Sequence, residues 1–98
     1  MKIVISPAIE AKLRDLHKVS PNEVDQCFQN IEGRFLEDTR EQHRTDPPTQ
    51  WFIAPTNHGR MLKVVFVARD DAIYIRTAYE PNPAELRIYS KHGLEGGT

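Results

Sequence analysis

The chain has 98 residues, enough for one domain with a single core and too few for two. Its 13 Lys and Arg residues are balanced by 14 Asp and Glu residues, so the formal net charge is -1, which excludes a whole-molecule positive field attracting nucleic acid or acidic lipid. The single cysteine excludes an intrachain disulfide, and no apolar run forms a signal peptide or reaches membrane-spanning length. We therefore expect a soluble, cytoplasmic single domain over residues 1–98, with no membrane partner.

The N-terminus predicts a short strand followed by an amphipathic helix. Met1 to Ile5 suits a strand, and Ser6-Pro7 provides an N-cap and a first helical residue. The helix is predicted to run from Pro7 to His17. Its buried stripe, at spacings of four and three, would consist of Ile9, Leu13 and Leu16.

A second helix is predicted by the capping-box pattern Ser20-Pro21-Asn22-Glu23. It should run to about Glu32, with Gly33 as a left-handed stop. The apolar residues expected on its buried side are Val24, Cys27, Phe28 and Ile31. Cys27 is thus interpreted as a small core residue and not as a reactive thiol.

The middle of the chain predicts an edge strand at 34–38, a mobile connection at 39–49 that is polar and contains Pro47-Pro48, and a strand at 50–55. A turn at 56–59 follows. A turn of two or four residues would place Trp51 on the core face and expose Phe52, whereas a three-residue loop would invert that assignment.

The stretch 61–79 is dense in β-branched and aromatic residues around Asp70-Asp71 and predicts a β-hairpin. Strict alternation gives the cross-strand pairs Ala68 with Ile73, Phe66 with Ile75, Val64 with Thr77, and Leu62 with Tyr79. Their shared face is the predicted core side, which includes Tyr79. The opposite face would carry Lys63, Tyr74 and Arg76.

Pro83 is suited to open a last helix over 84–91, with Leu86 and either Ile88 or Tyr89 turned inward, and residues 93–98 are expected to form a flexible tail. The fold class is therefore predicted to be α+β. Two N-terminal helices would pack on an antiparallel sheet of three to four strands, and a C-terminal helix would follow it.

The spacing of the four histidines excludes a recognisable metal motif, so we predict neither a metal nor a cofactor. The strongest chemical candidate is the cationic sheet face of Lys63, Tyr74 and Arg76, flanked by Arg60 and Arg69. Such a face can bind a phosphodiester, because Arg and Lys neutralise phosphate and Tyr stacks on bases. The alternative is a solvated sheet face on which charges suppress aggregation.

Three passages belong together: Leu16-His17-Lys18-Val19-Ser20 before the second helix, the hairpin halves Lys63 to Val67 and Ile73 to Arg76, and Thr77-Ala78 followed by Glu85, Arg87 and Tyr89. They resemble passages of the BrnT-type toxins of bacterial toxin–antitoxin pairs, which are similar in fold to RelE-type ribonucleases. The sequence departs from the family at Tyr79, where the family has Arg, and at Lys18, where it has Gly.

The resemblance implies the toxin of a type II toxin–antitoxin pair, acting as a metal-independent endoribonuclease on mRNA. Its partners would be RNA and a cognate antitoxin protein. The implied catalytic residues are Lys63, Arg76, Glu85 and His17, and the implied RNA-binding residues are Arg60, Arg69, Tyr74 and Arg87. Either Glu85 or His17 would be the base. The alternative is a non-catalytic protein- or RNA-binding module on the same fold.

Overall fold

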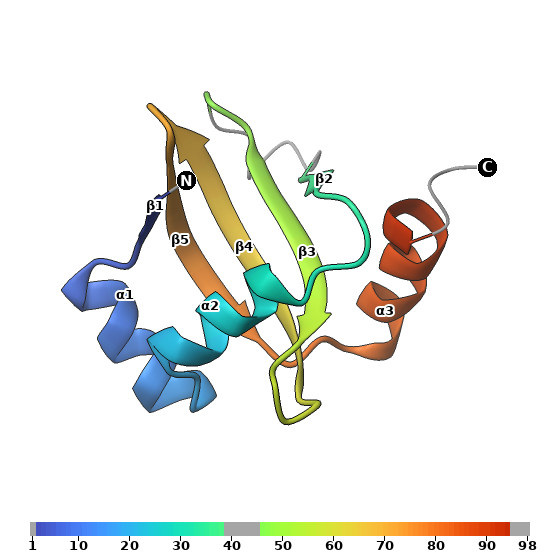
Figure 1. Cartoon of the computed structure of the whole chain (residues 1–98), viewed down its shortest axis with the longest axis horizontal. Coiled ribbons are helices and arrows are strands. Elements are labelled where there is room, and N and C mark those ends of the chain that lie inside the picture. Colours follow the sequence, from blue (N-terminus) through green and yellow to red (C-terminus); the bar gives the residue numbers. More distant parts are fainter. Residues whose placement is uncertain (1, 39–45, 95–98) are drawn as a thin grey trace.

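The computed structural model describes residues 2–38 and 46–94, which form an α+β domain, as predicted. Its sheet has five strands in the order β1-β5-β4-β3-β2 (Figure 1). The elements are β1 Lys2–Val4, α1 Pro7–Lys12, η1 Leu13–His17, α2 Pro21–Gln29, β2 Leu36–Glu37, β3 Thr49–Pro55, β4 Met61–Arg69, β5 Ala72–Tyr79, α3 Pro83–Tyr89 and η3 Ser90–Leu94. Within the predicted connection at 39–49, residues 39–45 lie outside the described residues.

The sheet is mixed, so the prediction of an antiparallel sheet with three to four strands is wrong. The β1 strand pairs in parallel with β5, with Lys2 opposite Ala72, and the other pairings are antiparallel. Hydrophobic alternation identifies a strand but not a partner that lies so far along the chain. The sequence pattern therefore predicted the β1 strand without placing it in the sheet.

The two N-terminal helical segments pack on one face of the sheet (Figure 1). The capping box is present, because the Ser20 hydroxyl accepts from the Glu23 backbone N–H while the Glu23 carboxylate accepts from the Ser20 N–H. Buried residues of the resulting core are Leu13, Val19, Val24, Cys27, Phe52, Ala54, Leu62, Val64, Phe66, Ile73, Ile75 and Ala78. This face is the main hydrophobic core.

The first helix departs from regular α geometry in its second half. The segment η1 is a five-residue π-helical turn, ended by Lys18 in the left-handed conformation with φ 56°. A π turn contains more residues than an α turn, so it rotates the side chains that follow. Leu16 is therefore 66% exposed, contrary to the predicted buried stripe, while His17 is half-buried.

The predicted core face of β3 is also inverted. Pro55 pairs with Met61, so the connection spans the five residues 56–60, an odd number. An odd loop exchanges the two faces of the strand relative to a two- or four-residue turn. Phe52 consequently lies in the main core, fully buried, and Trp51 lies on the opposite face.

The hairpin of β4 and β5 closes at Asp70-Asp71 as predicted, with positive φ at both residues. Its register holds as far as Phe66 opposite Ile75 and then shifts, because Thr77 pairs with Val65 and Arg76 is the extra residue of a β-bulge. Alternation cannot anticipate this insertion. The pairing of Tyr79 with Leu62 is therefore wrong, and Tyr79 pairs with Lys63 on the opposite face.

The α3 helix packs against that opposite face beside β3, away from α1 and α2 (Figure 1). Tyr89 is buried, 5.7 Å from the Trp51 ring between centroids, and Leu86, predicted inward, is 41% exposed. Gly33 was predicted to end the second helix in a left-handed conformation. Glycine is needed there for another reason, because a Cβ at position 33 would lie 2.7 Å from the Tyr89 hydroxyl. Of the predicted tail, Gly93 and Leu94 belong to η3, and residues 95–98 lie outside the described residues.

Candidate active site

A nearly buried lysine marks the candidate site. Lys63, in the middle of the sheet face under α3, is 7% exposed. Its Nζ lies 2.8 Å from Glu85 Oε2 and 4.5 Å from the centroid of the Trp51 ring. A buried ammonium group needs a counterion and polar contacts, and both are supplied here by residues distant in the sequence.

Glu85 is held by a second capping box at the start of α3. Its carboxylate accepts from the Asn82 backbone N–H at 2.9 Å, and its own N–H donates to Asn82 Oδ1 at 2.8 Å. Its other oxygen accepts from Lys63 Nζ and from the Tyr79 hydroxyl at 2.7 Å. Burial acts to raise the pKa of Glu85, but these hydrogen bonds, first that of Lys63, outweigh it and lower the pKa. Glu85 is therefore an ionised acceptor at neutral pH.

His17 adjoins the same group of side chains from the helical side. Its imidazole and the ring of Tyr79 have centroids 5.6 Å apart, with an interplanar angle of 38°. An irregular stretch of backbone places each of the two rings. His17 is the last residue of the π-helical turn η1, and Tyr79 comes three residues after the bulge at Arg76. Such insertions often occur at functional sites, where they redirect a side chain.

The polar cluster, by which we mean His17, Lys63, Tyr79 and Glu85, borders an open groove of about 690 Å³. The residues that line the groove are Leu36, Glu37, Asp38, Trp51, Lys63, Glu85, Ile88 and His92. Two members of the cluster, Lys63 and Glu85, are thus accessible from the groove. A polar group held at the wall of a groove is a common arrangement for a binding or catalytic site.

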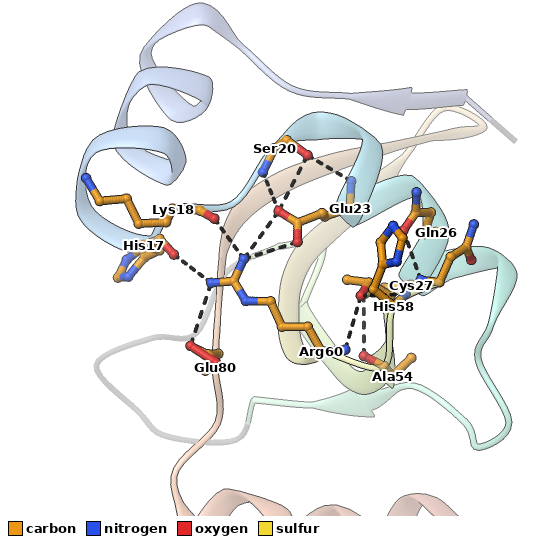
Figure 2. A network of polar contacts seen from close by, with 12 residues as sticks. His17, Lys18, Ser20, Glu23, Gln26, Cys27, Ala54, His58, Arg60 and Glu80 are labelled. Carbon is orange, nitrogen blue, oxygen red and sulfur yellow. Dashed lines mark hydrogen bonds and ion pairs between the residues drawn. The ribbon is translucent and has the colours of Figure 1, made fainter.

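Arg60, predicted to bind RNA, is engaged inside the protein. One guanidinium nitrogen, Nη1, donates to the Lys18 carbonyl at 2.7 Å and to the Glu23 carboxylate. The other, Nη2, donates to the His17 carbonyl at 2.9 Å and lies 3.7 Å from Glu80 Oε2 (Figure 2). These contacts place Arg60 beside the cluster as a connecting residue.

The remaining predicted residues are spread more widely. Arg76 is exposed at the bulge, and Arg69 is exposed six residues from Lys63 along β4, roughly 20 Å away at strand spacing. Tyr74 is 41% exposed and pairs with Val67, on the same face as Lys63. Arg87 is exposed on α3. The structure thus brings Lys63, Glu85 and His17 together and leaves Arg76 outside the hydrogen bonds described for the cluster.

The sequence interpretation placed two of these side chains on the wrong face of the sheet. Tyr79 was assigned to the core because the bulge was not foreseen, and Trp51 was assigned there because the loop length was not known. One available signal was overlooked, namely the Asn82-x-x-Glu85 spacing of a capping box with Pro83 at the first helical position. That spacing would have fixed the start of α3 and the orientation of Glu85.

Within residues 2–38 and 46–94, no three or more His, Cys, Asp or Glu side chains are grouped so that they could hold a metal ion. None of the described helices has the length and apolar character needed to cross a membrane. A comparison with protein-family models finds no match to this sequence, and a comparison with curated proteins finds none at a significant level. The resemblance to the BrnT family therefore stays a prediction.

Proposed function

We propose that this protein is a metal-independent endoribonuclease that cleaves RNA at the polar cluster. The observation that supports this most is the convergence of Lys63 and Tyr79 on one oxygen of Glu85 at an accessible groove. Two hydrogen-bond donors held 2.8 and 2.7 Å from an anion form a site suited to phosphate oxygens as well. An ammonium group has three N–H donors, so Lys63 can bind a phosphate without releasing Glu85.

The geometry favours His17 over Glu85 as the general base. Glu85 accepts hydrogen bonds at both oxygens, and its lowered pKa makes it a weak proton acceptor. His17 is half-buried at the edge of the cluster, and histidine is the side chain that most often serves as a general base. Glu85 then has the role of holding Lys63 and Tyr79 in place.

The reaction follows from these positions. His17 takes the proton of a ribose 2′-hydroxyl, the 2′-oxygen attacks the adjacent phosphorus, and the bond from phosphorus to the 5′-oxygen breaks. Lys63 stabilises the negative charge of the pentacoordinate intermediate, and the Tyr79 hydroxyl turns from Glu85 and gives its proton to the leaving 5′-oxygen. The products are a 2′,3′-cyclic phosphate and a 5′-hydroxyl. Solvent then takes the proton from His17 and returns one to Tyr79.

RNA would extend from this cluster over the sheet face of β4 and β5. Tyr74 and Tyr79 pair with Val67 and Lys63, which are four residues apart on β4, so the two tyrosines lie roughly 13 Å apart on one face. The exposed Tyr74 ring can stack on a base, and the exposed guanidinium of Arg76 can neutralise a phosphate. This path uses Tyr74, which was predicted to bind RNA, and Arg76, which was predicted to be catalytic.

Cleavage of a defined RNA in the presence of a chelator tests the proposal. Lys63→Ala, His17→Ala and Tyr79→Phe should each lower the rate at least roughly a hundredfold. The matched control is Arg14→Ala, which removes an exposed cation that pairs with its neighbour Asp15 and should cleave normally. The product ends should be cyclic phosphates. Cleavage that survives both Lys63→Ala and His17→Ala would contradict the assignment.

The toxin role and the antitoxin partner are proposed from the BrnT resemblance. A toxin of this type should arrest growth when expressed alone, and the adjacent reading frame should encode a small DNA-binding antitoxin that relieves the arrest. The Lys63→Ala variant is the control, because it should be harmless at the same expression level. Growth arrest by that variant would separate toxicity from RNA cleavage.

A non-catalytic protein-binding module is the second candidate, and one observation favours it. Glu37 and Asp38 line the same groove as Lys63 and Glu85, so part of the wall is acidic. An acidic wall repels phosphates and attracts basic segments of a protein. The folded wild type would then leave RNA intact in the cleavage assay, and would also be harmless in the growth assay.

A further inference from the structure

Arg60 connects the junction between η1 and α2 with the end of β5, two segments that are far apart in the sequence. Its guanidinium group binds the carbonyl oxygens of His17 and Lys18 at the end of η1, and the Glu23 carboxylate in the capping box of α2. It also pairs with Glu80, the residue that follows β5 (Figure 2). The side chains of Arg60 and Glu23 are 26% and 27% exposed, so this junction is partly shielded from solvent.

The backbone of Arg60 is itself fixed. Its N–H donates to Thr56 Oγ1 at 3.1 Å, and its carbonyl accepts from the Thr56 N–H at 2.8 Å. Thr56 is 3% exposed, and the loop is attached to α2 by a hydrogen bond from the Asn57 N–H to Gln26 Oε1. A side chain that starts from so constrained a loop can hold other segments in place.

The segments that Arg60 joins are those that bring together two rings of the polar cluster. It contacts the backbone of His17 directly and the carboxylate of Glu80, which adjoins Tyr79 in the chain. We propose that Arg60 is a positioning residue that holds the His17 imidazole against the Tyr79 ring. The inference deepens the RNA cleavage proposed above, and its effect on turnover rests on that proposal.

The guanidinium fork is needed for this role. Two different nitrogens reach two successive carbonyl oxygens, at 2.7 and 2.9 Å, while one of them also reaches Glu23. A lysine offers one compact cation on a flexible stem and cannot reproduce this planar arrangement. A cation at the last carbonyls of a helical segment also satisfies groups that have no partner within the helix.

The experiment compares wild type with Arg60→Lys, Arg60→Gln and Glu80→Gln. The matched control is Arg14→Gln, an arginine on the same π-helical turn whose ion pair is on the surface. Nuclear Overhauser effects between the rings of His17 and Tyr79 report positioning in the free protein. Turnover number, KM and the salt dependence of KM are then measured with RNA.

We expect the ring-to-ring signal to fall at least about threefold in both Arg60 variants, and less in Glu80→Gln, because the ion pair removed there is the longest of the contacts. The turnover number should fall roughly tenfold or more with KM nearly unchanged, since misplacing a catalytic group affects the reaction more than binding. Arg14→Gln should match wild type in every measurement. A general loss of structure would also disturb signals of the core, which Arg60→Lys should retain.

Three outcomes would overturn the inference. The first is an unchanged ring-to-ring signal in Arg60→Gln. The second is a raised KM with a reduced salt slope, which would identify Arg60 as a direct phosphate contact. The third is an Arg60→Lys variant whose ring signal and turnover both equal those of wild type. If the wild type does not cleave RNA, the proposed function fails, while the ring signals still decide whether Arg60 positions His17.

Discussion

The ion pair of Lys63 and Glu85 should contribute measurably to stability. The two side chains are 9% and 17% exposed, between the exposed pairs that contribute about 0.2–1 kcal/mol and the buried pairs whose disruption costs about 3–5 kcal/mol. We expect Glu85→Gln and Lys63→Met each to lower the free energy of unfolding by about 2 kcal/mol. Gln at position 85 keeps the capping-box hydrogen bonds, so the change tests the charge.

A double variant with both Glu85→Gln and Lys63→Met separates the interaction between the two side chains from the effect of each substitution on its other neighbours. In the double variant both charges are gone, so neither is left unpaired. Its free energy of unfolding should be about 2.5 kcal/mol below that of wild type, whereas the two single losses add to about 4 kcal/mol, and the difference is a coupling energy of about 1.5 kcal/mol. Urea unfolding of the four proteins measures this. Additivity within about 0.5 kcal/mol would refute the reasoning, because it would show that the contact at 2.8 Å contributes no net stability.

The same pair predicts a pH dependence. The pKa of Glu85 is lower in the folded state than in the unfolded state, so its contribution is complete above the ordinary glutamate pKa of about 4.3 and is lost as pH falls through the folded value. The stability difference between wild type and Glu85→Gln should thus be largest near neutral pH and shrink in acid. A difference that grows with acidification would contradict the direction of the shift.

Three further changes test other parts of the fold. Gly93→Ala places a Cβ against the Tyr89 ring and should lower the free energy of unfolding by about 2 kcal/mol or more. Gly59→Ala, at φ 84° with open space around it, should lower it by about 1 kcal/mol, and urea unfolding measures both. Ser20→Ala removes one half of the first capping box and should lower the free energy of unfolding by about 1 kcal/mol. Burial raises the pKa of the Cys27 thiol to about 12, so a thiol reagent should react with it only as fast as the protein unfolds; rapid reaction of the folded protein would show that the core is open there.

The sequence predicted elements whose determinants are local. The first capping box, the Asp70-Asp71 turn and the strand at residues 2–4 all depend on neighbouring residues, and the structure contains each of them. The α+β class followed from the order of these elements. Lys63, Glu85 and His17 were named as site residues and do lie in one cluster, although their chemistry is still a proposal.

The errors arose where one residue changes the phase of a pattern. A five-residue loop after Pro55 exchanged Trp51 and Phe52, the bulge at Arg76 moved Tyr79 to the other face, and the π-helical turn exposed Leu16. A rule based on alternating hydrophobic residues cannot detect these irregularities. The hydrophobic residues fit the pattern about equally well whichever face of the element is buried. All three irregularities place a side chain in or beside the candidate site, namely Trp51, Tyr79 and His17, so the positions hardest to predict are those with a proposed function.

The parallel pairing of β1 with β5 also has a consequence for synthesis on the ribosome. Lys2 pairs with Ala72, 70 residues later, so the first strand must wait roughly 4 to 14 s for its partner at ordinary rates of translation. β3 and β4 are made before β5, and until β5 is complete the edge of β4 that it will occupy is open and rich in apolar residues. Such an edge is a template for association with other chains. The sheet is thus completed only when β5 pairs with β1 and β4, late in synthesis. A chaperone that shields β4 on the nascent chain would therefore matter more for the yield of this protein than for its final stability.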